Sequence, residues 1–330
     1  MQTQKPKTEN RKPKTVLKAA ILAAGLGTRL LPLTERVPKT LLPVLNRPLL
    51  GLLLARMEDA GFLQVAVNTH HLAEQVQRFL ADRPWSLNLS ISPEPELLGT
   101  GGGLRRLGEI LGGGPFLALN GDILTDLDLG AVYQQHRQDA VASLVLHDCP
   151  PYNNVWVADG AVVGVGESPP PGAVGPPLAY TGVQVVGPGM MEYLPPGEPC
   201  DLVTAWRQAL AAGERLSALV VTGHFWQDLG TPGAYLTAHS RLLQGEAPEL
   251  ARYFGPVTDP LVEAGGIIEA GAKFGGGVCL GARVRIGAGA RLRRTVVWEG
   301  AVIEPGVELE ECIVASGVRV SRTARGEMLV

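Results

Sequence analysis

Apolar residues recur at intervals of six over the C-terminal part of the chain, and few folds accommodate such a spacing. The interval shortens to five twice, at Ile303 and at Val314. A helix repeats its apolar face about every 3.6 residues and a strand about every two, so neither explains the pattern. A solenoid of short strands does, when three six-residue units form one triangular coil. The residues expected to point into its core are Ile268, Phe274, Leu280, Ile286, Leu292, Trp298, Ile303, Leu309, Val314 and Val320.

Glycine supports the same interpretation. Fourteen of the 42 glycines lie in residues 255–330, where they permit tight corners between short strands. The glycines show no period of three, which excludes a collagen triple helix. The high glycine content therefore belongs in part to the solenoid and does not indicate disorder.

Before residue 245 the chain alternates strand-like and helix-like segments. Continuous apolar runs such as residues 19–24 are typical of buried parallel strands. The alternation predicts an α/β domain with a doubly wound sheet and right-handed crossovers. We expect strands at residues 19–24, 64–69, 87–92, 116–120, 141–147, 179–186 and 216–221, and helices at residues 49–60, 72–80, 104–111, 128–136, 202–212 and 232–243.

Four segments follow from these patterns. Residues 1–16 form a disordered basic tail, residues 17–245 the α/β domain, residues 246–262 a linker, and residues 263–330 the solenoid. The tail is polar and carries the chain's only basic run, which is typical of a solvated segment. Its basic residues are Lys5, Lys7, Arg11, Lys12 and Lys14.

Charge and hydropathy exclude several classes of function. The net charge of −3 gives no general attraction to nucleic acid. No apolar run approaches the ~18 residues of a membrane span, and we expect no secretory signal. The four cysteines are scattered without a CxxC pair, so we expect reduced thiols, a cytoplasmic location and no zinc site.

A glycine-rich loop follows the first predicted strand and reads Leu22-Ala23-Ala24-Gly25-Leu26-Gly27-Thr28-Arg29-Leu30. Such a loop offers backbone N–H groups to a phosphate. The dinucleotide fingerprint does not fit, because Leu30 stands where a third glycine is needed. A Walker loop does not fit either, because no GK[ST] follows. The loop alone predicts phosphate binding without naming the ligand.

The continuation of this loop is more specific. Residues 25–34 read G-L-G-T-R-L-L-P-L-T, and residues 38–44 read P-K-T-L-L-P-V. Further motifs are L-G-T-G-G-G at 98–103, N-G-D at 120–122, Y-T-G at 180–182 and W-Q-D-L-G-T-P at 226–232. Over residues 17–245 the chain resembles the sugar-1-phosphate nucleotidyltransferases, also called NDP-sugar pyrophosphorylases. Many members of that family carry a left-handed parallel β-helix of hexapeptide repeats, which matches residues 263–330. The implied fold is a Rossmann-like nucleotidyltransferase domain followed by this helix.

The resemblance implies that an NTP and a sugar 1-phosphate form an NDP-sugar and pyrophosphate, with Mg²⁺ as cofactor. The residue types suit this chemistry, because two polyanions must meet. Arg29 offers a planar fork for the leaving phosphates, Lys39 a compact cation for the α-phosphate, and Asp122 a hard ligand for Mg²⁺. By resemblance, Asp228 completes the metal site. The alternatives are a surface ion pair for Arg29, a solvated Lys39, a turn or N-cap for Asp122 and a helix cap for Asp228.

Two sets of binding residues are expected. The Gly99–Gly103 stretch is either a flexible loop or a place where bare backbone approaches a nucleobase, and Tyr180 either binds sugar or packs in the core. The expected nucleotide-binding residues are Leu22, Ala23, Ala24, Gly25, Gly27, Thr28, Arg29, Gly99, Thr100, Gly101 and Asn120. By resemblance the sugar phosphate is bound by Asn154, Tyr180, Thr181 and Gly182.

One departure from the family leaves the substrate open. Many members carry Glu-Lys-Pro where this chain reads Glu167-Ser168-Pro169, so the lysine for the sugar phosphate is missing. Residues 120–126 resemble MurNAc-1-phosphate uridylyltransferases, whereas residues 98–100 and the β-helix resemble mannose-1-phosphate guanylyltransferases. Guanylyl transfer to mannose 1-phosphate is the first hypothesis. The alternatives are uridylyl transfer to MurNAc 1-phosphate or another hexose 1-phosphate, and an inactive regulatory subunit that binds sugar nucleotides.

The solenoid is expected to serve in homo-oligomerisation. An acyltransferase site in the coils is not expected, because such enzymes usually use a histidine there and all six histidines precede residue 240. No nucleic acid or membrane partner is expected.

Overall fold

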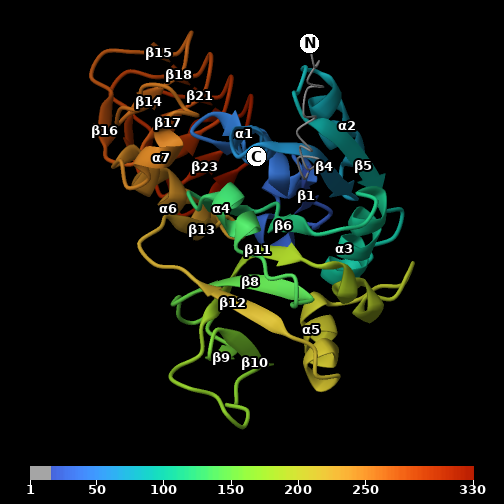
Figure 1. Ribbon diagram of the computed structural model, residues 1–330. Coiled ribbons are helices and arrows are strands. Elements are labelled where there is room, and N and C mark those ends of the chain that lie inside the picture. Colours follow the sequence, from blue (N-terminus) through green and yellow to red (C-terminus); the bar gives the residue numbers. More distant parts are fainter. Residues whose placement is uncertain (1–15) are drawn as a thin grey trace, which may run out of the picture.

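The computed structural model describes residues 16–330, so the basic residues of the tail lie outside the described residues. A nine-stranded sheet forms the centre of the first part of the chain, in the order β5-β4-β1-β6-β11-β8-β12-β10-β9 (Figure 1). Its strands are β1 (Leu17–Leu22), β4 (Phe62–Thr69), β5 (Asn88–Pro93), β6 (Phe116–Asn120), β8 (Ala142–His147), β9 (Val155–Ala158), β10 (Ala161–Val165), β11 (Ala179–Val186) and β12 (Leu216–Val220).

The sheet is mixed. Strands β5, β4, β1 and β6 are parallel, as expected for a doubly wound fold. Strand β11 then runs antiparallel to both β6 and β8, while β12 is again parallel to β8. The predicted α/β architecture is confirmed, with an antiparallel strand inserted between its two halves.

Helices cover both faces of the sheet, because alternate residues of each strand point to opposite sides. On β1, Ile21 joins the apolar cluster that contains Leu53 of α1 and Leu242 of α6. Ala20 joins a second cluster, with Leu104 of α3 and Trp206 of α5. The helices are α1 (Leu49–Asp59), α2 (Ala73–Ala81), α3 (Gly99–Ile110), α4 (Leu129–Gln134), α5 (Leu202–Ala211), α6 (Pro232–Leu243) and α7 (Pro248–Ala251).

Two short antiparallel ribbons lie outside the main sheet and were not expected from the sequence. In one, β7 (Ile123–Thr125) pairs with β13 (Trp226–Asp228), and Asp228 lies opposite Ile123. In the other, β2 (Pro43–Val44) pairs with β3 (Arg47–Pro48). Both ribbons adjoin segments that carry candidate site residues.

The C-terminal strands stack into three parallel sheets, which fits the expected β-helix. Their orders are β14-β17-β20-β23-β26, β15-β18-β21-β24 and β16-β19-β22-β25. The strands are β14 (Leu261–Val262), β15 (Ile267–Ile268), β16 (Lys273–Gly275), β17 (Cys279–Leu280), β18 (Arg285–Ile286), β19 (Arg291–Arg293), β20 (Val296–Val297), β21 (Val302–Ile303), β22 (Glu308–Glu310), β23 (Ile313–Val314), β24 (Arg319–Val320), β25 (Ala324–Arg325) and β26 (Met328–Leu329).

The predicted register is wrong at Trp298. Leu280 pairs with Val297, and Val297 pairs with Val314, so Val297 occupies the inward position. The shortened interval therefore lies between Leu292 and Val297, one repeat earlier than the expected interval from Trp298 to Ile303. Trp298 points out of the coil and joins the apolar cluster of the α/β part.

Ile268 also departs from the expectation that it points into a closed core, since it is 41% exposed. Strand β15 is the first of its sheet, so no preceding coil covers it.

Successive coils approach closely at Gly281, where a Cβ atom would lie 2.6 Å from the backbone nitrogen of Glu299. A side chain at this position would force the two coils apart.

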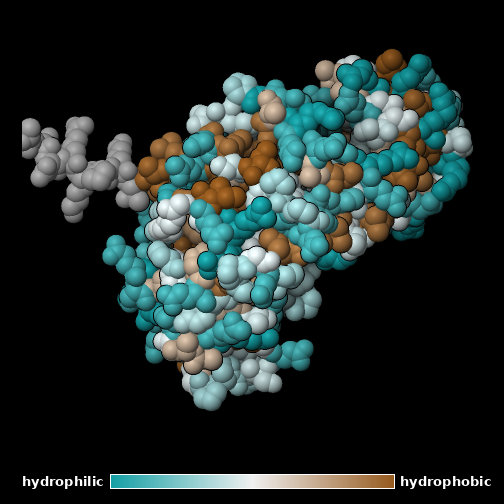
Figure 2. Space-filling view, turned by 90° about the vertical axis from the view of Figure 1, so that its right-hand side faces the viewer, coloured by the Kyte–Doolittle hydropathy of each residue, from teal (hydrophilic) through white to brown (hydrophobic). Residues whose placement is uncertain are grey.

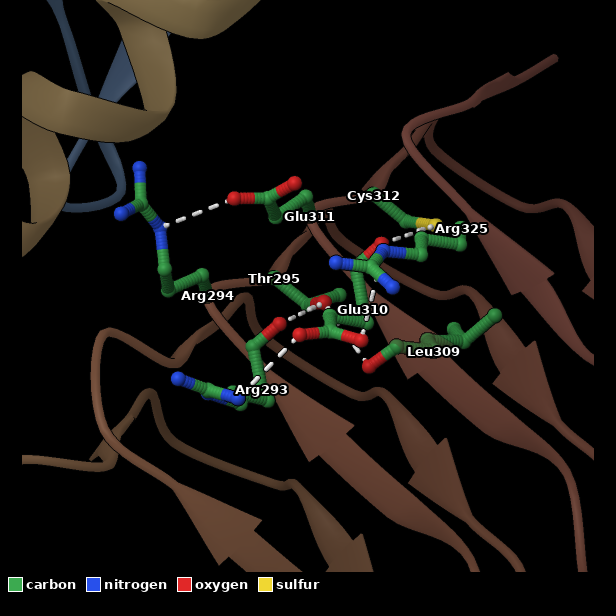
Figure 3. Close-up of polar contacts among 8 residues, drawn as sticks. All are labelled: Arg293, Arg294, Thr295, Leu309, Glu310, Glu311, Cys312 and Arg325. Carbon is green, nitrogen blue, oxygen red and sulfur yellow. Dashed lines mark hydrogen bonds and ion pairs between the residues drawn. The ribbon is translucent and has the colours of Figure 1, made fainter.

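Polar side chains form a ladder on the outside of the coils (Figure 3). Glu310 accepts from Arg293 of the preceding coil at 3.2 Å and pairs with Arg325 of the following coil at 3.5 Å. Beside them Arg294 pairs with Glu311 at 3.6 Å. These pairs are exposed, so each stabilises the stack only slightly.

The β-helix and the α/β part share one apolar cluster. Besides residues of the sheet and of the helices that cover it, that cluster includes five buried residues of the coils, which are Cys279, Val296, Trp298, Ile313 and Ala315.

On the face shown in Figure 2, hydrophobic and hydrophilic residues are interspersed. Among residues 16–330 no helix is both long and apolar enough to cross a membrane.

Candidate active site

A cavity of about 330 Å³ opens at the edge of the sheet where β1, β4 and β6 end. Ligands of α/β sheets bind at this carboxyl edge, near the strand where the order reverses. The cavity is lined by Leu22, Ala23, Ala24, Gly25, Gly27, Lys39, Thr40, Asn68, Glu94, Leu97, Gly99, Thr100, Asn120 and Asp122. The structure thus brings together most of the residues predicted to bind a nucleotide.

The glycine loop wraps one side of the cavity. Gly27 has φ +66°, and its carbonyl accepts a hydrogen bond from the Thr34 hydroxyl at 3.0 Å. The short 3-10 helix η1 (Thr28–Leu30) follows. Thr28 and Arg29 do not line the cavity; the Arg29 side chain is 57% exposed and extends to Asp228, 3.7 Å away.

The Gly99–Gly103 stretch is not a flexible loop, because α3 begins at Gly99 and not at Leu104 as expected. Gly99 and Thr100 face the cavity. Gly101, also predicted to bind the nucleotide, does not line the cavity. Its backbone N–H already donates to the Cys200 carbonyl at 2.8 Å.

A buried polar pair, Asn68 and Glu94, was missed by sequence reasoning. Asn68 accepts from the Ala23 N–H at 2.6 Å and donates to Glu94 at 2.7 Å, and Glu94 also accepts from the Leu98 N–H at 3.2 Å. A Cβ atom on Gly103 would lie 2.7 Å from the Asn68 amide nitrogen. The available signal was that Asn68 lies near the end of a strand and Glu94 directly after the next one.

The charged residues gather at one side of the cavity. Asp122 lies in the turn between β6 and β7 and forms an ion pair with Lys39, whose side chain is only 11% exposed. Burial raises the pKa of Asp228, and the charge of Asp122 raises it further. Asp228 does not cap α6, because Thr231 accepts from the Ala234 N–H in that role. Lys39 is therefore not merely solvated, and the helix-cap alternative for Asp228 is wrong.

The two carboxylates fit a divalent cation. The Leu229 N–H donates to the Asp122 carbonyl at 3.0 Å, which ties the two segments together. Asp228 Oδ1 is buried and accepts no hydrogen bond from the residues that the structure describes. Within residues 16–330 no group of three or more His, Cys, Asp or Glu side chains could hold a metal. Mg²⁺ commonly binds through one or two carboxylates together with substrate phosphates and water, and Asp122 and Asp228 supply two carboxylates.

The residues predicted to bind the sugar phosphate are spread more widely. Gly182 adjoins Asn120, since a Cβ atom on it would lie 3.2 Å from the Asn120 amide nitrogen. Thr181 is buried and donates to the Val145 carbonyl. Tyr180 packs edge-on against Trp206 with ring centroids 4.9 Å apart, and burial raises the pKa of Tyr180. Asn154 is exposed, and none of these four residues lines the cavity.

Comparison with known proteins identifies similar chains. The family model described as Nucleotidyl transferase matches residues 18–245. The chain is 36% identical over 220 residues to the N-acetylmuramate alpha-1-phosphate uridylyltransferase of Neisseria meningitidis serogroup B, with 65% of this chain and 94% of that protein aligned. It is 33% identical over 324 residues to the mannose-1-phosphate guanylyltransferase catalytic subunit beta of Drosophila pseudoobscura pseudoobscura, covering 94% and 86% of the two chains.

A further relative is the mannose-1-phosphate guanylyltransferase of Mycobacterium tuberculosis, 29% identical over 312 residues, with 92% of this chain and 80% of that protein aligned. Among solved structures, a UDP-glucose pyrophosphorylase from Acinetobacter baumanii superposes with a TM-score of 0.59 at 23% identity. That match covers 72% of this chain and 97% of the other, and it supports the fold.

Proposed function

Because the chain belongs to the nucleotidyl transferase family and is a sugar-1-phosphate nucleotidyltransferase, we propose that its reaction takes place in the cavity where strands β1, β4 and β6 end. The observation that carries this proposal is the meeting of Lys39, Asp122 and Asp228 beside the glycine loop. Cations and metal-binding carboxylates are what two reacting polyanions require. The products are an NDP-sugar and pyrophosphate.

In the proposed reaction, a phosphate oxygen of the sugar 1-phosphate attacks the α-phosphorus of the NTP. A new oxygen–phosphorus bond forms, and the bond to the β-phosphate oxygen breaks with release of pyrophosphate. Lys39 lies between the two phosphates and stabilises the charge that both bring. Among the described residues that line the cavity it is the only cation, and the family's lysine is absent at Ser168. Arg29 binds the leaving phosphates from the rim.

We propose Mg²⁺ as the cofactor, held by Asp122 and Asp228 with substrate oxygens completing its ligands. The support is the buried Asp228 Oδ1 without a partner and the hard oxygen donors of both residues. When bound, the ion offsets phosphate charge and favours departure of pyrophosphate. Before it binds, the ion pairs Lys39–Asp122 and Arg29–Asp228 compensate the carboxylate charges.

For the nucleobase we propose guanine, bound between the start of α3 and the Asn68–Glu94 pair. Glu94 is a buried carboxylate on the cavity wall, and each of its oxygens has accepted only one hydrogen bond. A carboxylate accepts only, so it suits the two adjacent N–H donors on the edge of guanine. Uracil offers a single N–H there, between two carbonyl groups.

For the sugar we propose mannose 1-phosphate. The guanylyltransferase relatives align over nearly the whole chain, coils included, at 29% to 33% identity. The MurNAc-1-phosphate uridylyltransferase relative has the higher identity, 36%, over a shorter part of the chain. UTP with MurNAc 1-phosphate is therefore the second candidate.

A matrix of NTPs against sugar 1-phosphates, scored by pyrophosphate release, tests the proposal. We expect the highest kcat/KM with GTP and mannose 1-phosphate. A maximum with UTP and MurNAc 1-phosphate would establish the second candidate. Binding of sugar nucleotides without pyrophosphate release from any pair would instead favour a regulatory subunit.

Homo-oligomerisation through the β-helix and a cytoplasmic location stay predictions. Light scattering of the purified chain tests the first, and fractionation of cells that express it tests the second. Neither affects the assignment of the site.

A further inference from the structure

The segment that carries Lys39 is held by a buried tyrosine. Lys39 begins the 3-10 helix η3 (Lys39–Leu41), and Pro43 follows in β2. Tyr235 of α6 is fully buried, and its hydroxyl bonds to the Pro43 carbonyl. The same hydroxyl accepts from the indole N–H of Trp298 at 3.2 Å. Because an indole N–H can only donate, the tyrosine proton must point to Pro43.

The turn that follows Pro43 is also held, by helix α6 on one side and by the β-helix on the other. The Leu45 N–H donates to His239 Nε2 at 3.2 Å, and His239 Nδ1 donates to the Tyr235 carbonyl at 2.9 Å. Asn46 donates through its amide to the Leu280 carbonyl of the β-helix at 3.0 Å. Helix α6 and the coils therefore hold residues 43–46, shortly after η3, from both sides.

We propose that Tyr235 is a positioning residue for Lys39, and that Trp298 makes the β-helix part of the catalytic apparatus. The connection is short. The Leu42 N–H donates to the Lys39 carbonyl at 3.2 Å, and Pro43, the next residue, receives the tyrosine hydrogen bond. At its other end the Lys39 side chain meets Asp122. This inference rests on the proposed role of Lys39 in the transfer reaction.

Tyr235→Phe tests the proposal, because it keeps the ring and removes both hydrogen bonds. A catalytic cation displaced by a fraction of an ångström lowers turnover strongly, so we expect kcat to fall about tenfold to a hundredfold. KM for both substrates should change less than about threefold, because the ground-state contacts of the cavity remain. Trp298→Phe should lower kcat in the same direction but less, since the bond to Pro43 survives.

The double variant distinguishes a shared connection from two separate effects. If Trp298 acts through the Tyr235 hydroxyl, Trp298→Phe should add no further loss to Tyr235→Phe. The matched control is Leu309→Ala, which opens a cavity inside the coils, in an apolar cluster separate from that of Tyr235, and lowers the melting temperature. At a temperature where all variants are folded, this control should keep the wild-type kcat.

Two kinetic results would overturn the inference. One is a folded Tyr235→Phe variant with wild-type kcat, and the other is an equal loss of kcat in the Leu309→Ala control. Amide hydrogen exchange of residues 39–48 gives a reading that does not need activity, with faster exchange expected in Tyr235→Phe and unchanged exchange in Leu309→Ala. Equal exchange in both would contradict the positioning role. An inactive wild type would contradict the proposed function alone.

Discussion

Asp122 combines an ion pair to Lys39 with a place beside the half-buried carboxylate of Asp228. Asp122→Asn keeps the size of the side chain but removes the negative charge that a metal ion requires. We expect loss of most Mg²⁺-dependent pyrophosphate release. Asp82→Asn, at the exposed end of α2, is the matched control and should behave as wild type. Unchanged turnover in Asp122→Asn across a Mg²⁺ titration would remove Asp122 from the metal site.

Lys39 has a different expected signature. In the proposed reaction it contacts charge that develops during transfer, and removing one such group commonly costs about 10²–10³ in kcat. Lys39→Ala should therefore lower kcat by this order with a smaller change in KM, whereas Lys273→Ala on the β-helix should have no effect. Steady-state kinetics of both variants decide the matter. A change confined to KM would mean that Lys39 binds substrate equally in the ground state and the transition state.

Gly103 tests the importance of the buried Asn68–Glu94 pair. A methyl group there would press on both polar side chains, 2.7 Å from the Asn68 nitrogen and 2.9 Å from Glu94 Oε1. We expect Gly103→Ala to raise KM for the NTP about tenfold, because the wall beside the base must shift. Gly233→Ala is the matched control, since a Cβ atom there meets nothing within 4 Å. Equal KM values in the two variants would show that the pair does not touch the nucleotide.

Among the individual site residues, the sequence predicted those that lie close together in the chain. Gly25, Gly27 and Arg29 belong to one contiguous motif, and Asp122 belongs to another. Asn68 and Glu94 come from two separate strand ends and meet only when those strands align. No local pattern distinguishes such residues from ordinary polar residues at the ends of strands.

Helix α6 gives a prediction for the pH dependence of stability. Burial lowers the pKa of His239 to about 4, and both ring nitrogens are satisfied only in the neutral form that donates from Nδ1. In the unfolded chain a histidine has a pKa of about 6.5, so below that pH the unfolded state binds more protons than the folded state does. The stability that His239 contributes is therefore complete above about pH 6.5 and declines as the pH falls toward 4.

Thermal unfolding between pH 7.5 and pH 5 measures this effect. The melting temperature of the wild type should fall more steeply with acidification than that of His239→Gln, which cannot titrate. His147, whose pKa burial also lowers to about 4, contributes equally in both proteins and cancels in the difference. Parallel curves for the two proteins would contradict the assignment of a buried neutral His239.

Elements with a long, regular pattern were predicted well, and short ones were not. Strand β11 has its expected bounds, and so does α6. The three-residue strands β7 and β13 were missed because two or three residues carry no measurable period. The start of α3 was placed five residues late, since glycines rarely favour a helix and here tertiary contacts with Cys200 override that preference.

For the molecule as a whole, the shared apolar cluster predicts cooperative unfolding. Five coil residues lie in the same cluster as the sheet, so neither part can expose its share without affecting the other. Calorimetry of the wild type should show one transition. Trp298→Ala removes the largest coil side chain of this interface and should separate unfolding into two transitions, while Val262→Ala, at an exposed site, should leave one. Two transitions in the wild type would contradict the prediction.

This junction could not be foreseen from the sequence. Trp298 fits the six-residue spacing as well as Val297 does, because both are apolar neighbours in the chain. Only the alignment of successive coils decides which of the two points inward. The sequence thus predicted two kinds of architecture but assigned the residue that joins them to the wrong side.

The hydrogen bond between Trp298 and Tyr235 also bears on how such a chain can change over generations. Loss of the coils would leave the Tyr235 hydroxyl without its donor. It would also expose the apolar surface of the α/β part that the coils now cover. A chain without the coils would therefore need polar substitutions on this surface of the α/β part, as well as a new partner for the Tyr235 hydroxyl.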